Sequence, residues 1–150
     1  MNEDILIDEL IRDEGERYFV YKDSLGIKTV GVGHNIESNS LPESMKHVLI
    51  GEPLTDDEVK ELLKQDIARV LEECNSFTWF GGLSDVRKRA ICNMVFNMGL
   101  SRFLGFRHMI EALEQCDFDK AAHEMLDSEW ADQVGSRADR LERMIRTDSV

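Results

Sequence analysis

Apolar residues recur at helical spacing over most of the chain, with one interruption near the N-terminus. Residues three and four positions apart lie on one face of an α-helix, so this spacing indicates helices with one buried side. The predicted helices cover residues 3–14, 56–74, 85–98, 106–115, 119–127 and 137–145. Capping residues support two of the starts, because Thr55 and Glu58 form a capping box and Ser84 precedes residue 85.

The interruption lies between the first two predicted helices. Residues 18–21 and 27–32 are rich in β-branched and aromatic side chains, and residues 22–26 between them include a glycine. Two such runs joined by a short loop that contains glycine predict a β-hairpin. A small β-hairpin beside many helices places the chain in the mainly helical α+β class.

Polar groups with catalytic potential cluster around the hairpin. Glu14 follows Leu10 and Ile11 by four and three residues, so it shares their inward face at the end of the first helix. An apolar setting at the negative end of a helix favours the neutral form of a carboxyl group, which a general acid needs. Asp23 falls in the turn and Thr29 on the returning strand, where these residue types are more often structural. Two carboxylates flanking one cleft are what glycoside hydrolysis requires.

The same stretch carries a family resemblance. Its motifs are Asp13-Glu14-Gly15, Tyr21-Lys22-Asp23, Gly26 and the run from Thr29 to His34, with a second dense region over residues 87–106. These motifs resemble the lysozyme of the T-even phages and its endolysin family, glycoside hydrolase family twenty-four. The resemblance spans nearly the whole chain and implies a lysozyme-like domain of two lobes with the substrate cleft between them. The implied layout is a small β-containing lobe over residues 13–55, a connecting helix over 56–74, and a helical lobe over 75–150 that includes the N-terminal helix.

The resemblance also implies a reaction, hydrolysis of the β-1,4 bond between N-acetylmuramic acid and N-acetylglucosamine in peptidoglycan. Glu14 would be the general acid, while Asp23 and Thr29 would position the attacking water. A water held in this way corresponds to inversion, for which the two carboxyl groups stand roughly 6.5–9.5 Å apart rather than roughly 5–5.5 Å. A chitinase-like activity is the enzymatic alternative. A non-catalytic wall-binding or virion structural module of the same fold, or a plain helical interaction domain, is the alternative from another class.

Six further residues are predicted to bind substrate: Gly33, Asn35, Phe96, Met109, Glu124 and Arg137. Gly33 has no side chain, which would let a bulky substrate approach the backbone, and the other five fall at positions of the family pattern. Asn35 and Met109 replace a leucine and a serine of the family pattern. Glu124 replaces an asparagine, and a carboxylate lacks the hydrogen-bond donors of an amide. At Phe96, core packing is the alternative to substrate contact. Arg137 falls at a family position beside the catalytic glutamate, so it is expected to pair with Glu14.

A structural pair is predicted from burial alone. Asp66 lies beside the apolar stripe of the helix over residues 56–74, where a carboxylate needs a partner. We predict an ion pair with His34 that ties the hairpin to this helix. Ordinary solvation of Asp66 at the surface is the alternative.

The net charge of the chain limits the kinds of partner that it can bind. The chain has 150 residues, 42% of them apolar, and a net charge of −12, so it has the material for one domain and an acidic surface. Nucleic acid is disfavoured, because binding to phosphates requires a basic surface. The expected partner is bacterial peptidoglycan, and we expect a monomer that needs no metal or cofactor. Bacterial walls are themselves mostly anionic, so repulsion at long range is expected.

The N-terminal residues give a prediction about localisation. The first four residues are acidic in character and lack the basic start and apolar run of a signal peptide. No apolar run approaches the roughly 18 residues of a membrane span. We therefore expect synthesis in the cytoplasm, no membrane insertion, and delivery to the cell wall in the periplasm by another factor.

Cysteine usage adds little. Three cysteines are present, and an odd number does not fit a disulfide framework. Cys92 falls in an apolar stretch and is predicted to be a small buried residue.

Overall fold

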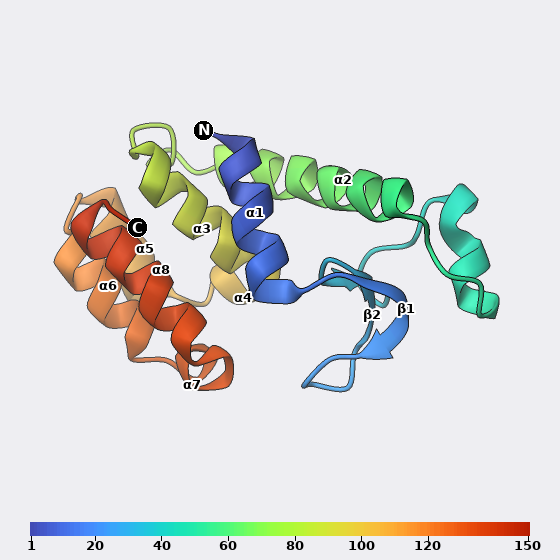
Figure 1. Cartoon of the computed structure of the whole chain (residues 1–150). Coiled ribbons are helices and arrows are strands. Elements are labelled where there is room, and N and C mark those ends of the chain that lie inside the picture. Colours follow the sequence, from blue (N-terminus) through green and yellow to red (C-terminus); the bar gives the residue numbers. More distant parts are fainter. The chain divides into compact units, whose positions relative to one another are not determined.

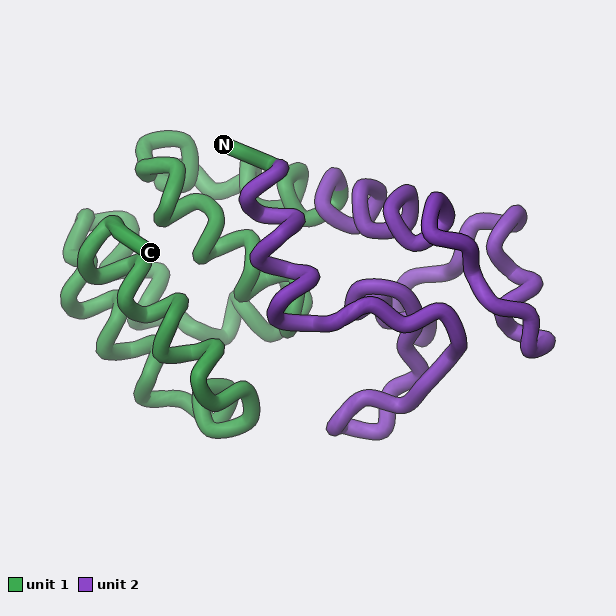
Figure 2. The backbone as a smooth tube through the Cα atoms, viewed as in Figure 1, with its two compact units in different colours: residues 1–3, 69–150 green, residues 4–68 purple.

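The computed structural model describes all residues, 1–150, with eight α-helices, one 3₁₀ helix and three strands. The backbone divides into two compact units (Figure 2). The sheet unit is Asp4–Ala68, and the helical unit is Arg69–Val150 together with Met1–Glu3. The first helix lies almost wholly in the sheet unit, whereas the layout implied by the resemblance places it in the helical lobe. The lobe boundaries themselves stay a prediction.

The sheet unit contains the N-terminal helix and all the strands (Figure 1). Its elements are α1 (Glu3–Glu14), β1 (Arg17–Lys22), β2 (Lys28–Gly31), β3 (His34–Asn35), the 3₁₀ helix η1 (Glu43–Ile50) and the first part of α2 (Asp56–Asn75). The strands form an antiparallel sheet in the order β1-β2-β3, so the predicted hairpin is confirmed. The third strand was not predicted, because two residues are too short to show an alternating pattern.

Helix α2 begins at the predicted capping box. The Thr55 backbone N–H donates to Glu58 Oε1 at 2.9 Å, and the Glu58 N–H donates to Thr55 Oγ1 at 3.1 Å. One face of the helix is buried through Val59, Leu62, Leu63 and Ile67. A Cβ on Gly31 of β2 would lie 3.6 Å from Leu62, which indicates that the sheet packs directly against this helix.

The helical unit contains the remaining helices (Figure 1). They are α3 (Asp85–Met98), α4 (Leu100–Phe103), α5 (Arg107–Glu114), α6 (Phe118–Leu126), α7 (Glu129–Val134) and α8 (Ser136–Thr147). Helix α3 has the predicted bounds, since the Ser84 hydroxyl accepts the Arg87 N–H and Gly99 follows the last residue. Helices α4 and α7 were not predicted, because segments of four and six residues are too short to show helical periodicity.

Aromatic rings and thiols fill part of the helical unit. Phe77, Trp79, Phe80, Phe103, Phe106 and Trp130 form a chain of ring contacts. Cys92 is fully buried, as predicted, and its hydrogen bond with Cys74 and its burial raise the pKa of its thiol. Because the thiolate is the reactive form, this thiol is chemically inert. None of the helices combines the length and the apolar character needed to cross a membrane.

Candidate functional site

Glu14 is the last residue of α1. The Gly15 N–H donates to the Ile11 carbonyl at 2.8 Å and Gly15 has a φ of +75°, so the glycine ends the helix as expected from the sequence. Leu6 and Leu10 are buried on the same helix, and Glu14 itself is half-buried. The sequence therefore places this carboxyl group at the edge of an apolar face rather than in open solvent.

Asp23 shapes the turn in which it stands. Its Oδ1 accepts the backbone N–H groups of Leu25 and Ile27, each at 2.9 Å. The Asp23 N–H in turn donates to the Ile27 carbonyl at 3.0 Å, which closes the loop between β1 and β2. Oδ2 has no hydrogen-bond partner in the structure. One oxygen of this carboxylate thus maintains the turn, and the other remains available for chemistry.

Thr29 lies at the centre of the sheet, on β2. It is directly opposite Tyr21 of β1 and Asn35 of β3, and it is 4% exposed. Its hydroxyl donates to the Ile27 carbonyl at 2.9 Å. Because the single hydroxyl proton is used in this bond, the Thr29 oxygen faces any further partner as an acceptor.

Two of the predicted substrate-binding residues lie in the same unit. Gly33 has a φ of +63° and lies against the side chain of Glu14. Asn35 Oδ1 accepts the Ser38 N–H at 3.0 Å, which leaves the Asn35 amide nitrogen as the group that can donate to a ligand. Residues Glu14, Asp23, Thr29, Gly33 and Asn35 therefore all belong to the sheet unit.

The predicted contact between His34 and Asp66 is present in the sheet unit. His34 Nδ1 lies 2.7 Å from Asp66 Oδ2, and both side chains are buried. His34 Nε2 lies 2.8 Å from the Asn39 carbonyl oxygen, so both ring nitrogens are engaged. The pair connects β3 to α2 and fixes the segment that carries Gly33 and Asn35.

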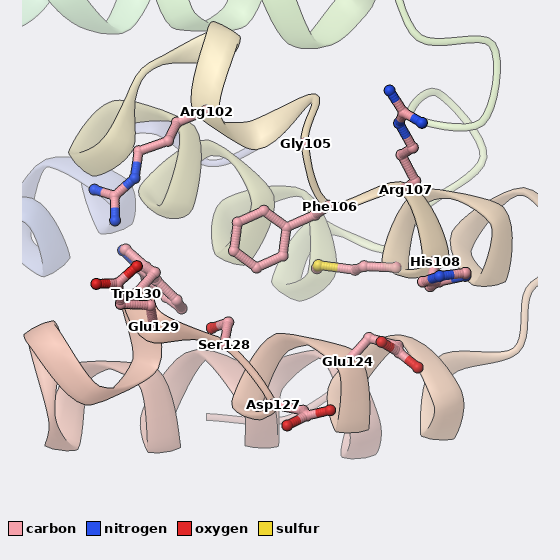
Figure 3. Close-up of a pocket in the computed structure, with 11 residues that line it drawn as sticks. Arg102, Gly105, Phe106, Arg107, His108, Glu124, Asp127, Ser128, Glu129 and Trp130 are labelled. Atoms are coloured by element: carbon pink, nitrogen blue, oxygen red, sulfur yellow. The ribbon is translucent and has the colours of Figure 1, made fainter.

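A pocket of about 380 Å³ lies in the helical unit (Figure 3). Its lining includes Met109 and Glu124, two of the six predicted substrate-binding residues. Figure 3 shows the Phe106 ring with Arg102 and Glu129 to its left, Arg107 and His108 to its right, and Glu124 and Asp127 below it. An apolar floor with polar groups at its edges is the general composition of a ligand pocket.

The other two predicted residues lie elsewhere in the helical unit. Phe96 is half-buried on α3 and does not line the pocket. Arg137 is buried on α8, where its Nε donates to Asn93 Oδ1 of α3 at 2.9 Å. The pairing of Arg137 with Glu14 that the family implies stays a prediction.

Sequence reasoning missed several residues near these groups. Tyr21 became visible only through the register of β1 and β2, which depends on the bonds that close the Asp23 turn. In the pocket, Arg107 and Glu129 belong to no motif, and only the fold brings them together with Phe106. The one sequence signal available for these residues was the alternation of side chains between the two faces of a strand. It applies to Tyr21 but not to the residues of the pocket.

The fold indicates a class of protein. A mainly helical α+β fold with a small three-stranded antiparallel sheet is that of lysozyme-like proteins. A family model for phage lysozymes matches residues 12–146, and the chain belongs to this family. It is accordingly a lysozyme, an enzyme that hydrolyses peptidoglycan.

Individual relatives agree with the family model. The chain is 34% identical to a probable T4-type lysozyme of Dictyostelium discoideum, over 95% of this chain and 94% of that protein. It is 37% identical to an endolysin of Salmonella phage P22, over 66% of this chain and 64% of the endolysin. It is also 30% identical to the pre-baseplate central spike protein of phage T4, over 94% of this chain but only 27% of the spike protein.

Proposed function

We propose that this lysozyme cleaves the β-1,4 bond between N-acetylmuramic acid and N-acetylglucosamine, with Glu14 as general acid and Asp23 and Thr29 holding the attacking water. The observation that carries the proposal is that the two oxygens of the Asp23 carboxylate have different hydrogen-bond surroundings. Two backbone N–H groups hold Oδ1 at 2.9 Å, and Oδ2 has no partner. The carboxylate is thereby held rigidly with one oxygen free to accept a proton.

The hydrogen bond of Thr29 supports the same reaction. Since the Thr29 hydroxyl donates to the Ile27 carbonyl, its oxygen can accept a hydrogen bond from water. A water that donates one hydrogen to Thr29 and the other to Asp23 Oδ2 would turn a lone pair of its oxygen toward the anomeric carbon. Attack by such a water, with Asp23 as base, gives inversion.

The surroundings of Glu14 support its proposed role as the general acid. It is half-buried at the end of α1, and the Gly33 backbone restricts where its carboxyl group can lie. A carboxyl group held in this way can protonate the oxygen of the leaving sugar as the glycosidic bond breaks. Neither proton transfer needs a metal or a cofactor.

Six residues are proposed substrate contacts. In the sheet unit, the Gly33 backbone lies beside the Glu14 carboxyl group, and the Asn35 amide nitrogen can donate to a sugar oxygen. In the helical unit, Met109 and Glu124 line the pocket, while Phe96 and Arg137 are further proposed contacts. The endolysin among the relatives supports a role in degrading the wall of a host cell, so we propose this role here.

The test is release of reducing sugar from purified peptidoglycan by the wild type, Glu14→Gln and Asp23→Asn. Loss of general acid or base catalysis costs about 10²–10⁴-fold, so both variants should be nearly inactive. The asparagine in Asp23→Asn still offers an oxygen to the Leu25 and Ile27 N–H groups, so the melting temperature of this variant should stay close to that of the wild type. Identifying the anomer of the new reducing end distinguishes inversion from retention.

Two results would contradict the proposal. Activity that survives in Glu14→Gln would assign the acid to another residue. Digestion of chitin oligomers without release of muropeptides would select the chitinase-like alternative.

A further inference from the structure

Three side chains form a row across one face of the sheet. Tyr21 of β1 is directly opposite Thr29 of β2, and Thr29 is directly opposite Asn35 of β3. Residues directly opposite each other in antiparallel strands point to the same face, with Cβ atoms about 4.5–5.5 Å apart. Tyr21 and Asn35 therefore flank Thr29, which agrees with the near-complete burial of the threonine.

Arg17 extends this row at its outer end. The pairing of β1 with β2 is irregular between Arg17 and Tyr21, as in a β-bulge, and such an irregularity redirects side chains. The Arg17 guanidinium lies 4.6 Å from the centroid of the Tyr21 ring. The structure shows no ion pair for Arg17, so the aromatic ring is what holds this cation in place.

Both candidate catalytic carboxylates act electrostatically on the Tyr21 phenol. Burial raises the pKa of the half-buried Tyr21 phenol, and the negative charges of Glu14 and then Asp23 raise it further, while Arg17 lowers it. The charges of these two carboxylates thus act on Tyr21, which also lies directly opposite Thr29.

We propose that Tyr21 is a positioning residue of this lysozyme, whose ring holds Thr29 on one side and the Arg17 guanidinium on the other. The inference rests on the proposed function, because it acts through the water that Thr29 and Asp23 would hold. The ring, rather than the hydroxyl, carries this role. Its loss would let Thr29 change rotamer and would misplace the water, while contacts with the distant parts of the substrate would stay the same.

The experiment compares Tyr21→Ile, Tyr21→Phe and Tyr18→Ile. Tyr18 is a matched control, because it lies on the same strand but donates its hydroxyl to Asp56 at 2.6 Å instead of flanking Thr29. Isoleucine suits a strand, so both isoleucine variants should fold. The measurements are kcat and KM on purified peptidoglycan, together with the melting temperature.

We expect Tyr21→Ile to lower kcat by about tenfold to a hundredfold with KM within about twofold, since misplacing a reacting group by about 1 Å costs up to 10²-fold. Tyr21→Phe keeps the ring and should retain kcat within about threefold. Tyr18→Ile should leave kcat unchanged. Arg17→Met, a change at an exposed residue, should lower kcat several-fold at unchanged KM, because the ring loses the group stacked on it.

Three outcomes would overturn the inference. One is a wild-type kcat in Tyr21→Ile, and another is a loss in Tyr21→Phe as large as that in Tyr21→Ile, which would assign the effect to the hydroxyl. If Tyr21→Ile does not fold, a wild-type kcat in Arg17→Met overturns it. An inactive Glu14→Gln beside a fully active Tyr21→Ile would refute this inference alone, whereas an active Glu14→Gln would refute the proposed function.

Discussion

Gly33 and Glu14 lie so close together that a side chain at position 33 would collide with the Glu14 carboxyl group. A Cβ at position 33 would lie 2.7 Å from Glu14 Cδ and 2.8 Å from Glu14 Oε1. The residue also has a φ of +63°, in the left-handed region that other side chains rarely adopt. The absence of a side chain at Gly33 therefore makes room for the carboxyl group of Glu14.

Substitution of Gly33 by alanine should harm activity more than stability. The methyl group would displace the Glu14 carboxyl, and we expect kcat to fall by about tenfold or more. Gly51→Ala is the matched control, because Gly51 has a φ of +93° but would place its Cβ within 4 Å of nothing. Each variant should lose about 1–2 kcal/mol of stability from backbone strain, measured by urea unfolding. Equal kcat values for the two variants would show that Gly33 does not control Glu14.

Two substitutions at Thr29 distinguish the role of its hydroxyl oxygen from the role of its branched side-chain shape. Thr29→Val keeps the branched side chain but removes the hydroxyl that bonds the Ile27 carbonyl, so kcat should fall by about 10²-fold or more. Thr29→Ser keeps the oxygen and should retain most of the activity. Steady-state kinetics on purified peptidoglycan measure both. A valine variant as active as the serine variant would exclude Thr29 from holding the water.

The buried pair of His34 and Asp66 should be strongly coupled. Removing one partner deprives the other, buried side chain of this hydrogen bond, which costs about 1–3 kcal/mol. A double-mutant cycle with His34→Ala and Asp66→Ala, followed by urea unfolding, should give a coupling energy above about 1 kcal/mol. Additive effects of the two substitutions would mean that the contact contributes no stability of its own.

His47 and Glu58 should make stability depend on pH in a defined window. The hydrogen bond with Glu58 raises the pKa of His47, and the hydrogen bond with His47 lowers the pKa of Glu58. The histidine contribution is fully present below its unfolded pKa, about 6.5, and is lost as pH rises through the raised folded value. The glutamate contribution is present above its unfolded pKa, about 4.3, and is lost as pH falls through the lowered folded value.

The melting temperature of the wild type should therefore exceed that of His47→Gln most clearly between about pH 4.5 and 6.5. Thermal unfolding from pH 3 to 9 measures this difference. A difference that is constant across the whole range would show that the substitution acts through packing and not through the ion pair.

The net charge of −12 predicts a dependence of activity on salt. If repulsion between the enzyme and an anionic wall limits their encounter, moderate salt should increase the rate, because the screening length is only about 8 Å at physiological ionic strength. Initial rates on intact walls from about 10 to 200 mM salt check this, with a soluble muropeptide oligomer as the control. A steady fall in rate with salt would point to docking through the arginine-bearing C-terminal helix.

Local signals in the sequence predicted the long elements well. The bounds of α3 followed from Ser84 before it and Gly99 after it, and the start of α2 followed from the capping box at Thr55 and Glu58. Each of these signals acts over three or four residues, so it is legible without knowledge of the fold. The contact of His34 with Asp66 was predicted from the cost of burying a carboxylate beside an apolar stripe.

Contacts between segments that lie far apart in the chain could not be predicted from the sequence. The approach of Gly33 to Glu14 depends on how β2 and β3 return past the end of α1. The position of Tyr21 opposite Thr29 depends on a register set by the bonds of Asp23 to Leu25 and Ile27. The short helices α4 and α7 have weak intrinsic stability, so they form only within the packed unit. The same holds for the pocket, which residues near these helices help to line.

The two oxygens of Asp23 also bear on how such a domain can evolve. An asparagine at this position keeps the oxygen that accepts the Leu25 and Ile27 N–H groups, and it differs from aspartate by a single base in the codon. The turn would survive that change while the base of the reaction would be lost. One mutation in a duplicated gene could therefore convert the enzyme into a stable, inactive domain that still binds its polymer. Natural selection could then retain that domain as a binding module.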